Sequence, residues 1–151
     1  MTTIYGVPLI PGNAEGEVLA SSHPLSFWGG VDPITGMVID QRHELCGQSA
    51  TGKILVFPGS KGSSTGSEVL LEAVMNKVAP AGMLVTRQEM ILTLGAILAE
   101  YLYQVHLPII KISDEELAQL LEAARIRIDV DGKIEVIETR KNLVPQKGTI
   151  K

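Results

Sequence analysis

The sequence is poor in cysteine and in aromatic residues: its 151 residues include one cysteine, and aromatic residues make up 4%. One cysteine excludes an intrachain disulfide framework, and a lone thiol cannot hold an iron–sulfur cluster, which needs several thiolates. No apolar run approaches the ~20 residues of a membrane span, and the first residues lack the basic and apolar regions of a signal peptide. We therefore expect a cytoplasmic protein with no membrane partner.

Charge is also scarce, since only 20% of the residues are charged and the formal net charge is −4. A nucleic-acid surface needs a basic stripe, which this sequence lacks, so we expect no nucleic-acid partner. Apolar residues make up 45% of the chain, enough for the core of one globular domain and too many for a disordered protein.

After a β-rich first third, strand-like and helix-like segments alternate, which predicts a single compact α/β domain over residues 1–139. Residues 1–14 would form an N-terminal extension, and residues 140–151 a polar, mobile C-terminal tail. Expected β segments are 16–21, 36–39, 53–57, 83–85 and 108–112, with a closing hairpin of 125–130 and 133–137; expected helices are 66–77, 90–102 and 117–124.

All three expected helices carry the capping-box pattern, in which one side chain bonds the N3 amide and a glutamate reaches back to the N-cap amide. The predicted pairs are Thr65 with Glu68, Thr86 with Glu89, and Ser113 with Glu116.

The most informative segment is the glycine- and serine-rich loop of residues 59–67, between an expected strand and an expected helix. Backbone N–H groups converge on an anion at such a junction. The spacing fits neither a P-loop, since the required lysine is missing, nor a dinucleotide-binding loop. Two interpretations stay open: the serines only cap the helix, or a hydroxyl of Ser63 or Ser64 acts as a base stabilised by amides, the helix dipole and a cation such as Lys61.

A second unusual segment places Phe27 and Trp28 side by side before two glycines. Because neighbouring side chains of an extended segment face opposite ways, at most one of these aromatics should belong to the core. The other would lie at a ligand or partner surface. An equally open alternative is that this loop only covers the core.

Residues 41–47 group Arg42, His43, Glu44 and Cys46. Their spacing matches no standard zinc pattern, and the other histidines are distant in sequence, so we predict no metal site in this chain. Cys46 is expected to be a small buried hydrophobic residue.

Four motifs resemble the small subunit, or swivel domain, of aconitase X enzymes: residues 26–33 (Ser-Phe-Trp-Gly-Gly-Val-Asp-Pro), 45–47, 62–67 (Gly-Ser-Ser-Thr-Gly-Ser) and 79–81. Their order and spacing match over residues 15–137. The resemblance implies a swivelling β/β/α fold. It also implies one part of a two-subunit hydro-lyase that is inactive without its large partner, which carries the iron or iron–sulfur centre.

In the wider aconitase superfamily, the first serine of the Gly-Ser-Ser loop is the base that takes the substrate proton, and here that position is Ser63. Aconitases continue with an arginine that grips a substrate carboxylate, whereas this chain has Thr65, so citrate should not be processed the same way. The resemblance makes the following residues candidates for contact with the substrate or the partner: Gly62, Ser64, Thr65, Phe27, Trp28 and Gly29.

Aconitase X enzymes include bacterial cis-3-hydroxy-L-proline dehydratases and archaeal phosphomevalonate dehydratases. The modest lysine and glutamate content does not resemble a hyperthermophile, which favours hydroxyproline as the substrate. Two other classes stay open. One is a stand-alone anion- or nucleotide-binding module, and the other is a non-catalytic interaction domain anchored by the aromatic pair.

Overall fold

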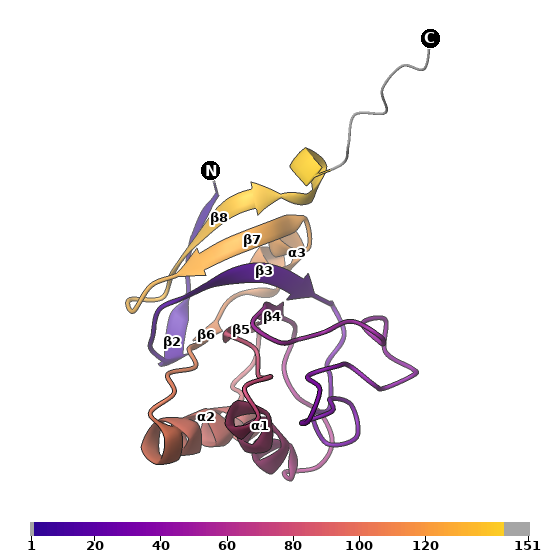
Figure 1. Cartoon of the computed structure of the whole chain (residues 1–151). Coiled ribbons are helices and arrows are strands. Elements are labelled where there is room, and N and C mark those ends of the chain that lie inside the picture. The colour runs from indigo at the N-terminus through magenta and orange to yellow at the C-terminus, as the bar shows by residue number, and fades with distance from the viewer. Residues whose placement is uncertain (1, 144–151) are drawn as a thin grey trace.

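The computed structural model describes residues 2–143, which form one mixed sheet with helices on both sides (Figure 1). The strand order is β1-β8-β7-β3-β4-β5-β6-β2. The strands are β1 (Thr3–Tyr5), β2 (Val7–Ile10), β3 (Ala14–Ala20), β4 (Ile54–Val56), β5 (Gly82–Val85), β6 (Ile109–Lys111), β7 (Ala123–Ile128) and β8 (Lys133–Thr139). The helices are α1 (Gly66–Met75), α2 (Met90–Tyr103), α3 (Asp114–Leu120) and the 3-10 helix η1 (Arg140–Leu143).

The sheet is nearly closed into a barrel by its two edge strands, which are consecutive in the sequence. β1 pairs with β8 at one edge and β2 pairs with β6 at the other. Gly6 joins them: its N–H donates to the carbonyl oxygen of Gly132 at 2.9 Å, and a Cβ there would lie 2.9 Å from the carbonyl oxygen of Lys111. Only glycine fits so close to the backbone. Residues 3–10, assigned by sequence to an extension, thus form both edges of the sheet.

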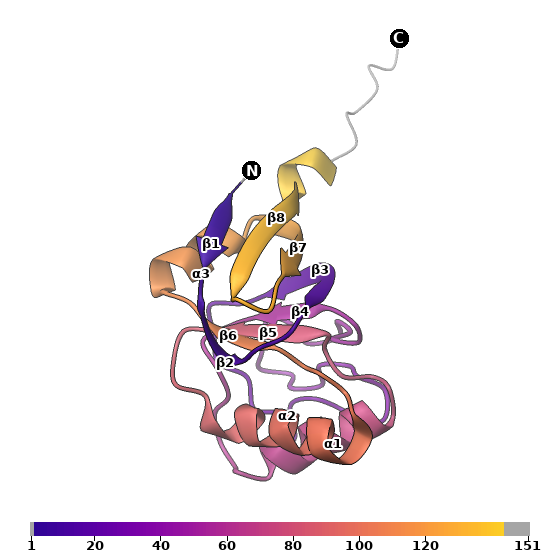
Figure 2. The same ribbon diagram turned by 90° about the vertical axis from the view of Figure 1, so that its left-hand side faces the viewer.

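Strand β4 lies at the centre of the sheet, parallel to β3 and β5, and all three of its residues are buried. Its side chains alternate between two hydrophobic cores. Leu55 and the following Phe57 belong to the core under α1 and α2, whereas Ile54 and Val56 belong to the core shared with α3, β7 and β8. Figure 2 shows α1 and α2 on one side of the strands and α3 on the other.

The predicted α/β class and the swivelling β/β/α fold are confirmed, with local differences. The strands expected in 53–57, 83–85 and 108–112 and the closing hairpin are present. Residues 36–39 make only isolated bridges. The helix expected over 117–124 lies earlier, because Ala123 and Ala124 already pair within β7. Of the expected tail, residues 140–143 form η1, and residues 144–151 lie outside the described part.

Only one of the three expected capping boxes forms within the described chain. At α3, the Glu116 N–H donates to Ser113 Oγ at 3.1 Å, and the Ser113 N–H donates to Glu116 Oε1 at 2.9 Å. The boxes predicted at Thr65 and Thr86 are wrong. Thr65 already has helical backbone angles, and the Glu89 carboxylate accepts the N–H of Ser60 and not that of Thr86.

No helix within residues 2–143 is long and apolar enough to cross a membrane.

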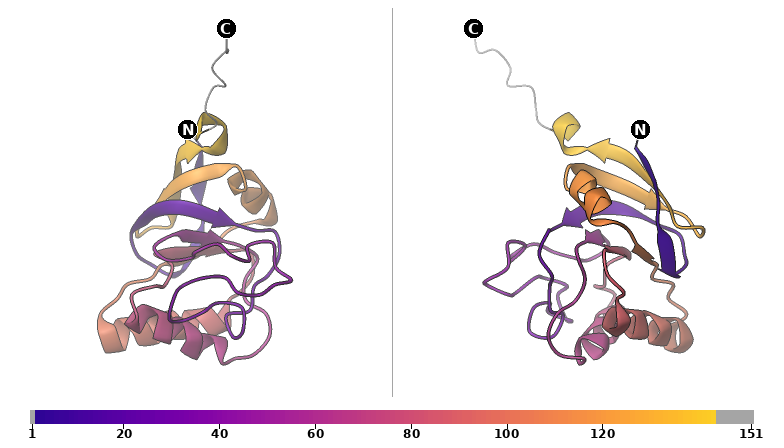
Figure 3. Two further views of the ribbon diagram at one scale, coloured as in Figure 1. Left: turned by 45° about the vertical axis from the view of Figure 1, so that its right-hand side comes forward. Right: turned by 180° about the vertical axis from the view of Figure 1, so that it is seen from behind.

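Helices α1 and α2 pack side by side beneath the sheet (Figure 3). Their close approach is made at Gly95, where an added Cβ would lie 2.8 Å from the carbonyl oxygen of Ser67. Ser67 belongs to the first turn of α1, so this contact also positions the loop that precedes α1.

We predict that Gly95→Ala lowers the free energy of unfolding by about 1–3 kcal/mol, because the new methyl group must displace backbone. The higher helix propensity of alanine would by itself stabilise α2 by about 1 kcal/mol, whereas the steric clash destabilises the fold, so the two effects have opposite signs. Urea denaturation measures the change. Gly12→Ala is the matched control, since its Cβ would meet Pro108 at an ordinary 3.4 Å. A Gly95→Ala protein as stable as the wild type would contradict the packing described.

Candidate functional site

The serine loop of residues 58–65 leaves the carboxyl end of β4 and is fixed by two neighbouring segments. The Thr86 N–H, just after β5, donates to the carbonyl oxygen of Pro58 at 3.2 Å, and the Leu25 N–H donates to that of Gly59 at 3.2 Å. The loop, the segment after β5 and the Phe27–Trp28 segment therefore converge at one end of the parallel strands. Open α/β sheets place ligands at such an end.

Ser63 is exposed at the start of α1, and its Oγ accepts the N–H of Thr65 at 3.1 Å. Gly62, the preceding residue, has a φ of +82°, and a Cβ there would lie 3.0 Å from Ser26 Oγ. A side chain at residue 62 would therefore be strained and crowded. The hydroxyl that receives an amide at this helix start is that of Ser63 rather than that of Thr65.

The other serines in the loop and in the first turn of α1 differ in their surroundings. Ser67 is buried, and its hydroxyl donates to the carbonyl oxygen of Ser64 at 3.0 Å. The side-chain oxygen of Ser60 is buried and has no hydrogen-bond partner among residues 2–143. Ser64 is exposed beside Ser63. Ser63 and Ser64 therefore present two adjacent hydroxyls to any ligand or partner protein that lies over the loop.

A buried carboxylate, that of Glu89, lies beneath the loop. Glu89 is 6% exposed, and its Oε1 accepts the N–H of Ser60 at 2.9 Å. Charge-assisted hydrogen bonds of this kind are stronger than neutral ones. The sequence pattern predicts a capping box for Glu89, but the glutamate instead ties the start of α2 to the serine loop.

The two aromatics separate as expected, because Phe27 is 1% exposed and Trp28 is 59% exposed. The ring of Phe27 belongs to the core under α1 and α2, so Phe27 reaches the site only by packing near Gly66. Trp28 and Gly29 lie at the surface, with the Trp28 backbone N close to Gly66. Of the pair, Trp28 is therefore the side chain available to a ligand or partner.

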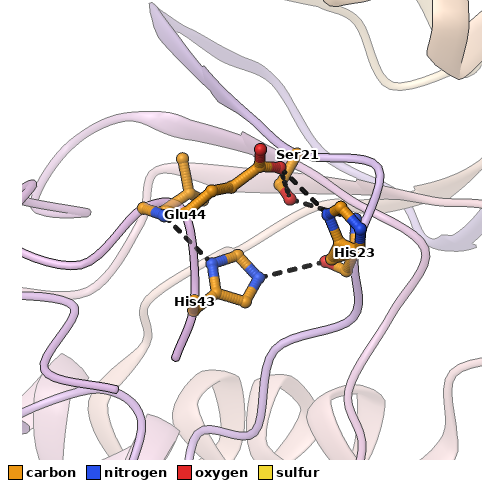
Figure 4. Close-up of polar contacts among 5 residues, drawn as sticks. Ser21, His23, His43 and Glu44 are labelled. Atoms are coloured by element: carbon orange, nitrogen blue, oxygen red, sulfur yellow. Dashed lines mark hydrogen bonds and ion pairs between the residues drawn. The ribbon is translucent and has the colours of Figure 1, made fainter. Parts of the chain in front are cut away.

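A polar cluster that the sequence did not predict joins Ser21, His23, His43 and Glu44 (Figure 4). The Ser21 hydroxyl donates to Glu44 Oε1, and His23 Nδ1 lies 3.3 Å from the same oxygen. First the Ser21 hydrogen bond and then His23 lower the pKa of the Glu44 carboxyl below its usual range. Because the hydroxyl donates to a carboxylate and not to a histidine, Ser21 is not activated as a nucleophile.

A cavity of about 230 Å³ connects this cluster with the serine loop. Lys61 of the loop and Arg42 both line it, together with His23 and His43.

Within the described residues, no three His, Cys, Asp or Glu side chains are placed to hold a metal ion. The expectation that Cys46 is buried is wrong, because its side chain is exposed.

One known family matches this sequence: the model of the aconitase X swivel domain covers residues 3–139. The chain belongs to the aconitase X swivel-domain family. It is 45% identical over 125 residues to the phosphomevalonate dehydratase small subunit of Methanothermobacter thermautotrophicus, a match that covers 82% of this chain and 91% of that protein. The chain therefore matches the small subunit of an aconitase X-type dehydratase over most of its length.

Two further similarities bear on the family. The chain is 50% identical over 101 residues, or 67% of its length, to the cis-3-hydroxy-L-proline dehydratase of Pseudomonas aeruginosa, but that match covers 17% of the longer protein. The crystal structure of Thermococcus kodakaraensis aconitase X (holo-form) superposes with a TM-score of 0.79 at 39% identity, covering 91% of this chain and all of the matched chain. The swivel domain therefore occurs both as a separate chain and as part of a longer one.

We predict that Glu89→Ala lowers the free energy of unfolding by about 1–3 kcal/mol, because it leaves the Ser60 N–H without its acceptor. Hydrogen exchange at the Ser60 amide should become faster than in the wild type. Glu72→Ala, an exposed glutamate in the middle of α1, is the control and should change neither quantity. Unchanged exchange at Ser60 would show that the carboxylate does not hold the loop.

The lowered pKa of Glu44 predicts a pH-dependent contribution to stability. A carboxyl whose pKa is lower in the folded state stabilises the fold above its unfolded pKa, near 4.5, and loses this effect as pH falls through the folded value. The wild type should therefore be more stable than Glu44→Gln at pH 7, and the difference should shrink at pH 3. Urea denaturation at both pH values measures it. A difference that is equal at both pH values would contradict the Ser21–Glu44 contact.

Proposed function

We propose that this small subunit supplies Ser63 as the base that removes a substrate proton in a two-subunit hydro-lyase. The observation that carries the proposal is the position of Ser63 Oγ. It is exposed at the N-terminus of α1 and accepts the N–H of Thr65 at 3.1 Å. A serine hydroxyl is a weak base unless negative charge on its oxygen is stabilised. An amide donor and a helix N-terminus both stabilise such charge.

In the proposed reaction, Ser63 Oγ acts as the alkoxide: it takes the proton of a C–H bond next to the substrate carboxylate and becomes a neutral hydroxyl. The electron pair of that bond forms a carbon–carbon double bond, and the hydroxyl on the adjacent carbon leaves. An iron or iron–sulfur centre, which we assign to the large subunit, would act as a Lewis acid on the departing hydroxyl. Cys46, the one cysteine of this chain, is exposed and lies outside the serine loop.

The remaining residues proposed to bind substrate lie in the serine loop and in the Phe27–Trp28 segment. Gly62 keeps the backbone accessible, and Ser64 offers a second exposed hydroxyl. Trp28 and Gly29 would border the substrate or the partner. Thr65 lacks the positive charge with which an arginine would bind a carboxylate, so the anionic group of the substrate must be bound elsewhere.

We propose cis-3-hydroxy-L-proline as the substrate, supported by the 50% identity to the Pseudomonas aeruginosa enzyme. Phosphomevalonate is the second candidate. The small-subunit relatives of matching length carry that name. The cavity beside the loop favours neither candidate, because Asp40 and Glu44 line it together with Lys61 and Arg42. Both compounds are 3-hydroxy acids, so in each of them Ser63 would remove the proton on the carbon next to the carboxylate.

We expect the complex of this chain with the large aconitase X subunit of the same source to dehydrate one of these two substrates. Ser63→Ala should lower kcat by about 10²–10⁴-fold, the usual contribution of a general base, without dissociating the complex. Ser22→Ala, an exposed serine outside the loop, is the matched control and should retain wild-type kcat.

Other outcomes would favour the alternative classes. Substantial turnover by Ser63→Ala would remove Ser63 from the mechanism. Thermal stabilisation of the isolated chain by a nucleotide or phosphate, with no activity in the complex, would support an anion-binding module. Loss of partner binding in Trp28→Ala, with no measurable effect of Ser63→Ala, would support an interaction domain.

A further inference from the structure

Helix α2 is apolar on two faces, although the fold covers only one of them. Its inner residues, Leu92, Gly95, Ala96 and Ala99, are buried. A helix that is hydrophobic all round is normally buried on all sides. Within Met90–Tyr103 the sequence has one charged residue, Glu100.

The uncovered side is a stripe of four large side chains, which we call the outer face of α2: Met90, Leu94, Ile97 and Tyr101. Their spacing of four, three and four residues places them on one side of the helix. Their exposed fractions are 72, 50, 49 and 79%. Contiguous exposed apolar side chains of this kind mark an interaction surface more often than isolated ones do.

The outer face is continuous with the proposed active-site loop. A groove of about 440 Å³ runs between the starts of α1 and α2 and is lined by Ser64 and Ser67 on one side and by Met90, Leu94 and Ile97 on the other. Ser64 directly follows Ser63. A protein surface that fills this groove would therefore also lie against the loop.

The relatives indicate which protein associates with this domain. In Pseudomonas aeruginosa the matched segment is 17% of one long chain, whereas in Methanothermobacter thermautotrophicus the matched protein is a separate small subunit. A covalent link holds the domain in the first case. A separate chain must obtain the same association from its surface. The partner that this requires is a large subunit with an apolar patch.

We propose that the outer face of α2 is the docking surface for the large aconitase X subunit, seated so that the Met90 end brings Ser63 to the shared active site. This inference rests on the proposed function. A second copy of this chain is a poorer occupant, because it would cover the serine loop without bringing the metal centre that the proposed function assigns to the large subunit.

The test measures the dissociation constant of the complex with the large subunit of the same source by calorimetry. Leu94→Asp and Ile97→Asp should each weaken binding by at least ~30-fold, the effect of losing a buried hot-spot residue. Leu94→Met should bind like the wild type. Val130→Asp changes an equally exposed residue, 53% against 50% for Leu94, on the β7–β8 turn and should also bind like the wild type.

Circular dichroism and thermal melts check that each variant is folded. Hydrogen exchange in α2 of the wild type should slow when the large subunit binds. Binding by folded Leu94→Asp within about threefold of wild type would overturn the proposal, since threefold is well under 1 kcal/mol. Dimerisation of the isolated chain that Leu94→Asp abolishes, with affinity for the large subunit unchanged, would overturn it in favour of a second copy.

Turnover separates this inference from the proposed function. At saturating large subunit, Leu94→Asp should recover wild-type kcat, because the variant weakens docking and leaves the chemistry intact; Ser63→Ala should not recover. If the aspartate variants lose binding but the wild-type complex dehydrates neither substrate, the docking surface is supported and the proposed function fails. If the complex is active and the variants bind normally, only the docking surface fails.

Discussion

The structure depends on the burial of β4 on both faces. Its three residues are fully buried, and their side chains alternate between two cores. Such a strand can lie only at the centre of the sheet, with helices α1 and α2 on one side and α3, β7 and β8 on the other. Because the chain passes from β4 through the buried Phe57 into Pro58 and Gly59, the position of this strand also determines where the serine loop begins.

The serine loop is fixed by hydrogen bonds to the rest of the domain on one side and is exposed to solvent on the other. Hydrogen bonds from Leu25, Ser60 and Thr86 link it to its neighbours, and the buried Glu89 carboxylate accepts one of them. Ser63 and Ser64 remain exposed at the surface, and Ser64 also lines the groove beside α2. Together with the exposed outer face of α2, this arrangement is what one half of a shared site requires.

The periodic segments were predictable because local pattern decides them: the buried parallel strands, the hairpin and the split between Phe27 and Trp28. Features that depend on contacts between residues far apart in the sequence could not be predicted from local patterns. The closure of the sheet depends on Gly6 passing beside Lys111, and the Ser21–Glu44 contact spans 23 residues. The patterns at Thr86–Glu89 and Ser113–Glu116 are equivalent in sequence, yet Glu89 bonds Ser60 because the loop after β4 lies beside it.

The proposed reaction requires that Ser63 face the reacting carbon of a substrate held between the two subunits. A crystal structure of the complex with an unreactive substrate analogue tests it most directly. We predict Ser63 Oγ about 3–3.5 Å from the carbon next to the carboxylate, the separation of a reactive arrangement. A structure in which Ser63 points into solvent, while another side chain lies next to the reacting carbon, would contradict the proposed role of Ser63.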